Sequence, residues 1–379
     1  MRRPASLPFP GTPPEKKEER KDLMSPKTIC LLAVLVVCAY PATAGTYYVG
    51  TCKTGSFATI GAAVKTAPVG STILICPGQY SEQVIISKDL TLNGLNSSAA
   101  NGATGAVIAN APTPEMTTSP IFAFNKNPIL GGTIAPVIWV TGATVNIQNV
   151  FVTTPAGSCT SSSIPKTVGF YYATGASGTL NHVGFFGQGC SVGIWAENAS
   201  FTPTAVTVEN SYSAAGIVAG SPPNLTNGTL TVTIKGNQVF PTSPDGSYGI
   251  YLFGVSGTVE ANFISGPRLS GGDVLSGTAI VDDGAAQTEL TISGNTIQVI
   301  ADALINVIYY GGIEALVDGA TIKGNKISGP QNGITLTCHA GMVSGNTISY
   351  ATIGLDLVPT ASLGVNTFYN TPSKIGEGC

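Results

Sequence analysis

The sequence is organised by a repeated motif. The segment TISGNTIQ (residues 291–298) returns as TIKGNKIS (321–328) and as MVSGNTIS (342–349). Each copy places Asn and then an apolar residue behind a short strand-prone run. The same pattern recurs at Asn149, Asn210, Asn237, Asn262, Asn295, Asn325, Asn346 and Asn366. From Asn210 onward the intervals between these residues are 27, 25, 33, 30, 21 and 20 residues. Such a loose period is typical of a solenoid whose strands are constant and whose loops vary.

Each repeat contains a second predicted strand. It reads GFYYA (169–173), GIWAE (193–197), GIVAG (216–220), GIYLF (249–253), AIVDD (279–283), GITLT (333–337) and GLDLV (354–358). Alternation along a strand would send Ile250, Leu252, Ile334 and Leu336 inward and the residues between them outward. Short strands with Gly at the corners predict an all-β solenoid of about ten coils.

The repeated Asn has a structural explanation. Asn and the Gly before it tolerate left-handed backbone angles, and the Asn amide both donates and accepts hydrogen bonds. Stacked in register, each Asn could bond to the next coil and so satisfy a buried polar group. We therefore expect a ladder that fixes the register of the coils, rather than a set of ligand-binding residues.

The N-terminal end of the solenoid is expected to carry a cap. In SFATIGAAVKTAP (56–68), Ser56 is a candidate N-cap, and Phe57, Ile60, Ala63 and Val64 follow at helical spacing. A short amphipathic helix here would cover the open end of the first coil, where an uncovered edge favours aggregation.

The beginning of the chain predicts export. Residues 24–44 combine Lys27, an apolar run from Thr28 to Tyr40 and the small-residue ending Ala42-Thr43-Ala44. These are the parts of a secretory signal peptide, and the apolar run is too short to span a bilayer comfortably. We expect a leader or misassigned start at 1–23, a signal peptide at 24–44 and one domain at 45–379, located outside the cell or in the periplasm without membrane insertion.

Charge and cysteine content narrow the partners. From Gly45 onward the net charge is −6, which disfavours nucleic acid. Six cysteines remain after signal removal, an even number that suits disulfides in an exported chain. Fifteen pairings are formally allowed; because neighbouring coils bring sequential positions together, we expect Cys52–Cys76, Cys159–Cys190 and Cys338–Cys379. The absence of Cys-x-x-Cys, and the wide separation of His182 from His339, disfavour a metal site.

One N-terminal stretch resembles a known family. The segment FATIGAAVKTAPVGSTILICPGQYSEQVIISKDLTLNGL (57–95) has a cap helix, a strand, Pro-Gly-x-Tyr-x-Glu (77–82) and two further strands. This pattern is similar to that of pectin-methylesterase-like proteins in the pectin lyase-like superfamily. The resemblance implies a single-stranded right-handed parallel β-helix and a carbohydrate-related activity.

The catalytic motifs of these families are not matched. A methylesterase would have Gln-Asp where this chain has Gln188-Gly189. Polygalacturonase-like hydrolases share only a double Asp, Asp282-Asp283, and a His-x-Gly at His339. Pectate-lyase-like enzymes need a cationic base and calcium carboxylates, and the only Arg after residue 44 is Arg268.

The candidate catalytic segment is SGPRLSGGDVLSGTAIVDDG (265–284). It holds Arg268, Asp273, Asp282 and Asp283. Paired carboxylates on one face could serve as general acid and base in glycoside hydrolysis, or bind calcium beside an Arg that neutralises a uronate. The alternative is a solvated loop with a surface ion pair between Arg268 and Asp273. We expect no cofactor, calcium being the one exception that these carboxylates would suit.

A candidate substrate-binding face lies on the second strands. Tyr171, Trp195 and Tyr251 fall at the same outward position, with Glu197, Phe253 and Asp282 assigned two residues further on. Exposed aromatic rings suit the apolar face of a sugar, and carboxylates bind its hydroxyl groups. In the alternative, loops such as 154–167 and 221–229 fold over the rings and bury them.

Three functions remain open. The first is a monomeric protein that binds a pectin-like or other uronate-containing polysaccharide, with or without cleaving it. The second is a non-catalytic adhesion or scaffold module, favoured by the low content of Arg, Lys and His. The third, an accessory protein resembling the copper-site maturation solenoids, is disfavoured because Met and His do not cluster.

Overall fold

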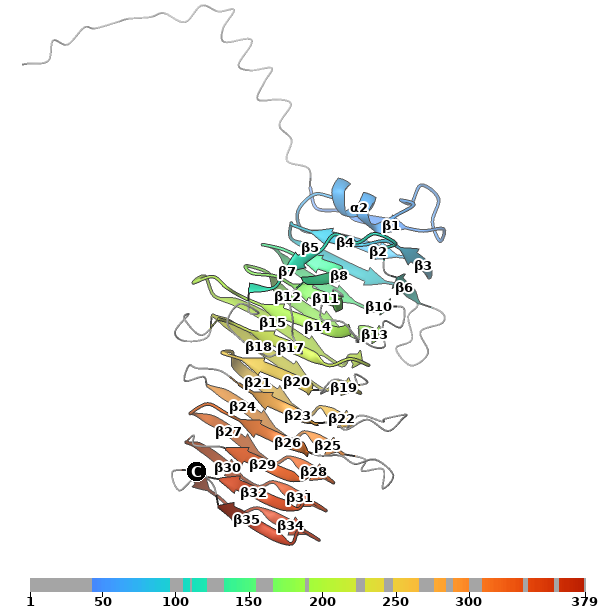
Figure 1. Ribbon diagram of the computed structural model, residues 1–379. Coiled ribbons are helices and arrows are strands. Elements are labelled where there is room, and N and C mark those ends of the chain that lie inside the picture. Colours follow the sequence, from blue (N-terminus) through green and yellow to red (C-terminus); the bar gives the residue numbers. More distant parts are fainter. Residues whose placement is uncertain are drawn as a thin grey trace, which may run out of the picture. The chain divides into compact units, whose positions relative to one another are not determined.

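The computed structural model describes residues 43–95, 105–109, 111–120, 133–154, 166–187, 191–222, 229–241, 248–265, 276–283, 289–299, 309–336, 340–357 and 361–377. Almost all of its elements are strands, which stack coil upon coil (Figure 1). The predicted leader and nearly all of the predicted signal peptide lie outside the described residues. No helix in the described part is long and apolar enough to cross a membrane.

The strands form three parallel sheets, here called A, B and C, and each coil contributes to them in turn. Sheet A contains β1 (Thr46–Val49), β2 (Ser71–Ile75), β5 (Leu90–Gly94), β9 (Thr144–Gln148), β12 (Ser177–Asn181), β15 (Thr204–Glu209), β18 (Leu230–Lys235), β21 (Ser256–Glu260), β24 (Leu290–Ser293), β27 (Ala320–Lys323), β30 (Gly341–Ser344) and β33 (Ser362–Leu363).

Sheet B contains β3 (Gly78–Ser81), β6 (Ala106–Ala109), β10 (Val150–Thr153), β13 (Gly184–Phe186), β16 (Tyr212–Ser213), β19 (Gln238–Val239), β22 (Phe263–Ser265), β25 (Thr296–Gln298), β28 (Lys326–Ser328), β31 (Thr347–Ser349) and β34 (Thr367–Tyr369). Its strands are short and alternate in the chain with those of the other two sheets.

Sheet C contains β4 (Val84–Ile86), β8 (Thr133–Val140), β11 (Lys166–Tyr172), β14 (Ser191–Glu197), β17 (Ile217–Gly220), β20 (Tyr248–Phe253), β23 (Ser276–Asp282), β26 (Tyr309–Ala315), β29 (Asn332–Leu336), β32 (Ile353–Leu357) and β35 (Ser373–Glu377). A short strand, β7 (Thr117–Thr118), pairs antiparallel with β8. The fold is a right-handed parallel β-helix, as the sequence predicted, and the described strands make 11 to 12 rungs per sheet rather than about ten.

Alternation along the strands fills the interior. Ile250, Leu252, Ile334 and Leu336 are all fully buried in one apolar column, which confirms their predicted inward direction. Burying an Ile or Leu side chain stabilises the fold by about 1.5–3 kcal/mol. Because each coil adds such residues to the same column, the column is continuous through the described coils.

The Asn ladder is present from Asn237 to Asn366. Each side-chain amide donates to the Oδ1 of the next Asn, at 2.9 Å from Asn295 to Asn325 and from Asn325 to Asn346. The backbone N–H of each Asn donates to the same oxygen, and the amide also donates to a carbonyl of a preceding coil, as from Asn295 to Val259. The buried amides therefore find partners on both sides.

Asn149 and Asn210 do not belong to this ladder, in contrast to the sequence prediction. Both have positive φ, 56° and 49°, and so occupy the left-handed corner position that Gly fills before Asn295. His182 does the same at φ 53°, so it is a corner residue one position before the ladder. At the rung of Asn210 the ladder position is Ser211, whose N–H donates to Asn237 Oδ1 at 2.9 Å.

The predicted cap helix is α2 (Ile60–Thr66), which buries Ile60, Ala63 and Val64. Its N-cap is Thr59 rather than Ser56, because the Thr59 hydroxyl accepts from the Ala62 N–H at 3.2 Å. Glu82, from the Pro-Gly-x-Tyr-x-Glu motif, accepts the N–H groups of Ile60 at 2.8 Å and Gly61 at 2.9 Å. A carboxylate on the following coil thus satisfies donors that the helix leaves unpaired.

The predicted Cys52–Cys76 disulfide is present, with the two Cα atoms 5.6 Å apart. It ties the first coil to the loop before α2. The other predicted disulfides involve Cys159, Cys190, Cys338 and Cys379, which lie outside the described residues.

Candidate functional site

The outer face of sheet C carries the predicted site residues. Ile250, Leu252 and Ile280 point into the interior, so Tyr251 and Val281 between them point outward. The register gives this outward position, from β8 to β32, to Trp139, Tyr171, Trp195, Val218, Tyr251, Val281, Glu314, Thr335 and Asp356. The face is therefore aromatic and apolar as far as Val281 and polar beyond it.

The aromatic half of the face is covered. Tyr171, Trp195 and Tyr251 are 2 %, 0 % and 1 % exposed and belong to a second apolar cluster outside the interior column. These rings share one register position, as the sequence predicted, but they do not form an open platform. At these coils the structure agrees with the alternative prediction, in which other segments cover the rings.

Glu197 is a buried acceptor at the centre of the covered half. Its carboxylate accepts hydrogen bonds from the hydroxyl groups of Tyr171 and Ser119 and, at 3.2 Å, from the indole N–H of Trp195. Burial raises the pKa of Tyr171, and the neighbouring carboxylate raises it further, so its phenol stays a donor. Because a buried carboxylate needs such partners, Glu197 organises the packing of this face in the described structure.

Asp282 and Asp283 point to opposite faces, which corrects the expectation that they pair on one face. Asp282 alternates with Ile280 and pairs in register with Leu252, so it points inward and is fully buried. Among the described residues, neither of its carboxyl oxygens has a hydrogen-bond partner. Burial, and then the negative charge of Asp283, raise the pKa of Asp282 to about 7.

Asp283 lies on the outer face, where the structure brings it close to Glu314. The hydroxyl of Tyr251 donates to Asp283 Oδ2 at 2.7 Å, and the hydroxyl of Thr278 donates to Glu314 Oε2 at 3.1 Å. Both carboxyl groups are half-buried. Burial raises the pKa of Glu314, the Thr278 bond lowers it, and the negative charge of Asp283 raises it again, with a net rise. The Glu314 carboxyl therefore holds its proton to a higher pH than an exposed Glu does.

Polar groups continue along the face beyond Glu314. Thr335 and Asp356 follow in the same register position on β29 and β32. The Asn332 amide donates to Asp356 Oδ2 at 3.5 Å, and Asn332 and Thr335 are 8 % and 4 % exposed. Asp356 is half-buried. The outer face of these coils therefore offers carboxylates, an amide and hydroxyl groups within a few rungs.

No family model matches the chain, and no curated protein matches it in sequence. Its structure is similar to that of the DFA-IIIase from Arthrobacter chlorophenolicus A6 without its lid (14 % identity, 88 % of this chain and 100 % of that chain covered, TM-score 0.45). It is also similar to the pectin methylesterase PemA from Erwinia chrysanthemi (14 % identity, 82 % of this chain and 81 % of that chain covered, TM-score 0.37). A third similar structure is the catalytic unit of the GH87 alpha-1,3-glucanase from Streptomyces thermodiastaticus strain HF3-3 (12 % identity, 82 % of this chain and 64 % of that chain covered, TM-score 0.35). At these identities the similarity is one of fold alone.

The sequence interpretation missed Glu314, Thr278 and Ser119. A signal for Glu314 was present, because Gly-Ile-Glu (312–314) matches the Gly-Ile-x strands and places Glu where Tyr251 and Thr335 stand. Ser119 gives no such signal, since it reaches Glu197 from a segment 78 residues earlier in the chain. The predicted site residues Arg268 and Asp273, and His339, lie outside the described residues.

Proposed function

We propose that this protein binds and hydrolyses a polysaccharide on the outer face of sheet C, at the coils of β20, β23 and β26. The observation that carries the proposal is the pair of half-buried carboxyl groups of Asp283 and Glu314, close enough for the charge of one to raise the pKa of the other. Two carboxyl groups, one protonated and one ionised, are what glycoside hydrolysis requires.

The surroundings assign the roles. Glu314 is the general acid, because burial raises the pKa of its carboxyl and favours the protonated form at a pH where an exposed Glu is ionised. Asp283 is the partner carboxylate, held in place by the hydrogen bond from the Tyr251 hydroxyl. It acts as base or nucleophile. Of the catalytic residues predicted from sequence, Asp283 is kept and Glu314 replaces Asp282; Arg268 and Asp273 remain predictions.

The charge of the face argues for a neutral substrate. Asp283 and Asp356 would repel the carboxylates of a uronate chain, because like charges near a weakly polar wall are costly, and a protonated Glu314 supplies no positive charge to offset this. We therefore prefer a neutral glycan to the pectin-like substrate expected from the sequence. Hydrolysis in place of elimination is in keeping with this choice, since it needs no cation to neutralise a uronate.

The test combines binding with release of reducing ends. The wild type, Glu314→Gln and the control Glu289→Gln are incubated with neutral glucans, galactans and xylans, and with polygalacturonate and alginate. Glu289 is an exposed carboxylate that immediately precedes β24 of sheet A, so its variant makes the same charge change on another face. We expect a neutral glycan to be bound by all three proteins and cleaved by the wild type and Glu289→Gln only. Equal cleavage by Glu314→Gln would remove the acid assignment, and cleavage of the acidic chains alone would overturn the neutral substrate.

A non-catalytic adhesion or scaffold module is the second candidate. The burial of Tyr171, Trp195 and Tyr251 favours it, because it removes the aromatic platform that a long sugar chain would use. In the same experiment this candidate predicts that none of the glycans is cleaved. Binding that survives in Glu314→Gln, without release of reducing ends by any variant, would establish the module over the enzyme.

A further inference from the structure

The outer face of sheet A carries a column of threonines. One outward register position runs through every strand of the sheet, from β1 to β33. Thr occupies nine of the twelve described positions, which are Thr46, Thr72, Thr91, Asn146, Thr179, Thr207, Thr233, Thr258, Thr291, Thr321, Met342 and Ser362. We call this set the threonine column.

Strand preference alone does not explain the column. Thr is favoured in strands generally, so a simple preference would place it equally at the other outward positions. The next outward position on β5 to β30, two residues further along each strand, holds Asn93, Gln148, Asn181, Glu209, Lys235, Glu260, Ser293, Lys323 and Ser344, with no Thr. Thr is thus concentrated at one register position of the described sheet, with Thr144 and Thr231 as outward exceptions on β9 and β18.

The hydroxyl groups of the column are available to a ligand. Every described member is exposed or half-buried. Thr179 donates to Asn146 at 2.8 Å, but in the later coils Thr207, Thr233, Thr258, Thr291 and Thr321 make no side-chain hydrogen bond to any described group. Because a hydroxyl group both donates and accepts hydrogen bonds, each of these groups can bind a water molecule or a ligand.

The spacing of these groups is regular along the column. Neighbouring strands of a sheet lie about 4.8 Å apart, so the hydroxyl groups repeat at that distance where Thr follows Thr. Thr144, Ser177, Thr231 and Ser256 add further hydroxyl groups two residues earlier on four of the strands, at a distance of roughly 6.6 Å. The result is a grid of hydroxyl and methyl groups that is regular along the column and partial across it.

The charges on and beside the threonine column indicate which kind of partner it could bind. All members of the threonine column are uncharged, and the charged residues Glu209, Lys235, Glu260 and Lys323 stand in the flanking column. A neutral, periodic partner therefore fits best. The column contains no aromatic ring, which a sugar chain would use for stacking. The oxygen positions on a face of ice repeat in two directions at distances of this size, so we propose that the threonine column binds the surface of ice crystals.

The test compares two double variants on the same two coils. Thr233→Lys/Thr291→Lys places bulk and charge in the column on β18 and β24. The control Gln238→Lys/Gln298→Lys makes the same charge change at exposed residues of β19 and β25 in sheet B. Circular dichroism and thermal melting confirm that each protein is folded, and ice recrystallisation and partition into a growing ice hemisphere are measured.

We expect the wild type and the control to slow recrystallisation and enter the ice, and the column variant to lose both properties. The proposal is overturned if the wild type behaves like serum albumin in both assays, or if the column variant is as active as the control. Crystalline chitin and cellulose are tested in parallel. A wild type that is inactive on ice but binds one of these solids through the column would assign the face to a neutral glycan instead.

Discussion

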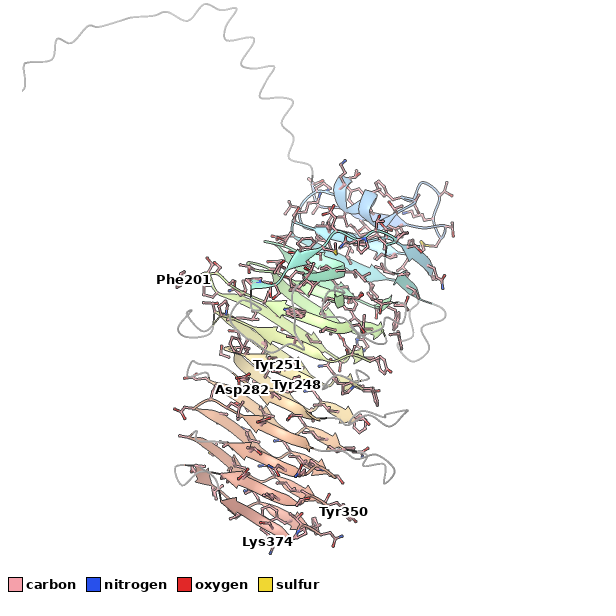
Figure 2. All side chains as sticks on the ribbon, viewed as in Figure 1. Phe201, Tyr248, Tyr251, Asp282, Tyr350 and Lys374 are labelled. Carbon is pink, nitrogen blue, oxygen red and sulfur yellow. A yellow bond between two sulfur atoms is a disulfide. The ribbon has the colours of Figure 1, made fainter. Side chains whose placement is uncertain are left out.

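Asp282 and Leu252 are register partners on neighbouring coils, and both side chains point into the interior of the β-helix. Figure 2 labels Asp282, on β23, beside Tyr251 and Tyr248. These two tyrosines lie on β20, the strand that pairs with β23. The carboxyl has no hydrogen-bond partner in the described part of the chain, and the ionisable groups nearest to it in the register are the carboxyls of Asp283 and Glu314, which supply no positive charge. Nothing described there stabilises an ionised Asp282.

The first prediction concerns pH. The pKa of Asp282 is about 7 in the folded protein and 3.8 in the unfolded chain, so the folded protein binds this proton more tightly. This tighter proton binding contributes up to about 4 kcal/mol to the free energy of unfolding. The contribution is fully present below pH 3.8 and is lost as the pH rises to about 7. In Asp282→Asn this loss should vanish, and above pH 7 the variant should be more stable than the wild type. Denaturant unfolding from pH 4 to 9 checks this; parallel pH profiles for the two proteins would refute it.

The second prediction concerns the ladder. Asn295→Ala removes the oxygen that accepts from Asn262 and the amide that donates to Val259 and Asn325. Several buried groups lose partners at once, and each costs about 1–3 kcal/mol, so we expect a loss of at least about 3 kcal/mol. Asn366→Ala, at the half-buried end of the ladder, should cost less. The two are compared by urea unfolding, and equal losses would mean that the ladder does not depend on burial.

The third prediction concerns the cap. Glu82→Ala leaves the N–H groups of Ile60 and Gly61 without their acceptor, which should cost about 1–2 kcal/mol. Glu115→Ala is the control, because its described contacts with Gln83 use backbone atoms. Hydrogen exchange of α2 should increase in Glu82→Ala alone. Unchanged exchange would show that Thr59 is sufficient as a cap.

The fourth prediction concerns the disulfide. Cys52 and Cys76 are 24 residues apart, and a crosslink of this length typically contributes about 2–4 kcal/mol. Cys52→Ser/Cys76→Ser should lower the melting temperature, whereas a reductant should have no further effect on this variant through that bond. A variant that melts with the wild type would show that the crosslink is neutral.

The fifth prediction concerns export. β1 begins at Thr46, just after the predicted cleavage site at Ala44, so removal of the signal leaves the first strand intact. Mass spectrometry of the secreted protein should find Gly45 at the N-terminus. Protein retained in the cytoplasm with residues 24–44 attached would contradict the export proposal.

The architecture was predictable because the sequence contains two regular patterns, the alternation of apolar residues along each strand and the repeat of Asn from coil to coil. Strand alternation gives the direction of Ile250 and Leu252, and the repeated Asn marks one corner of each coil. The same alternation, applied from Ile280, would have sent Asp282 inward. Asp282 was instead aligned with Glu197 and Phe253, a place that belongs to Asp283 because Val281 is the register partner of Tyr251.

The state of the outer face was not predictable in the same way. Whether Trp195 is exposed depends on which segments pack over sheet C, and a contact such as that of Ser119 with Glu197 joins residues far apart in the chain. No periodic pattern encodes such a contact. The pairing of Asp283 with Glu314 likewise depends on the register of β23 and β26, which are separated by a whole coil.

The titration of the Glu314 carboxyl tests the pairing of Asp283 with Glu314 most directly, because an Asp283 variant is expected to lose hydrolysis itself. By carbon-13 NMR we predict a pKa of Glu314 above the ordinary Glu value of about 4.3 in the wild type, and a shift to lower pH in Asp283→Asn, where the neighbouring charge is gone. A Glu314 titration that stays in place in Asp283→Asn would contradict the pairing.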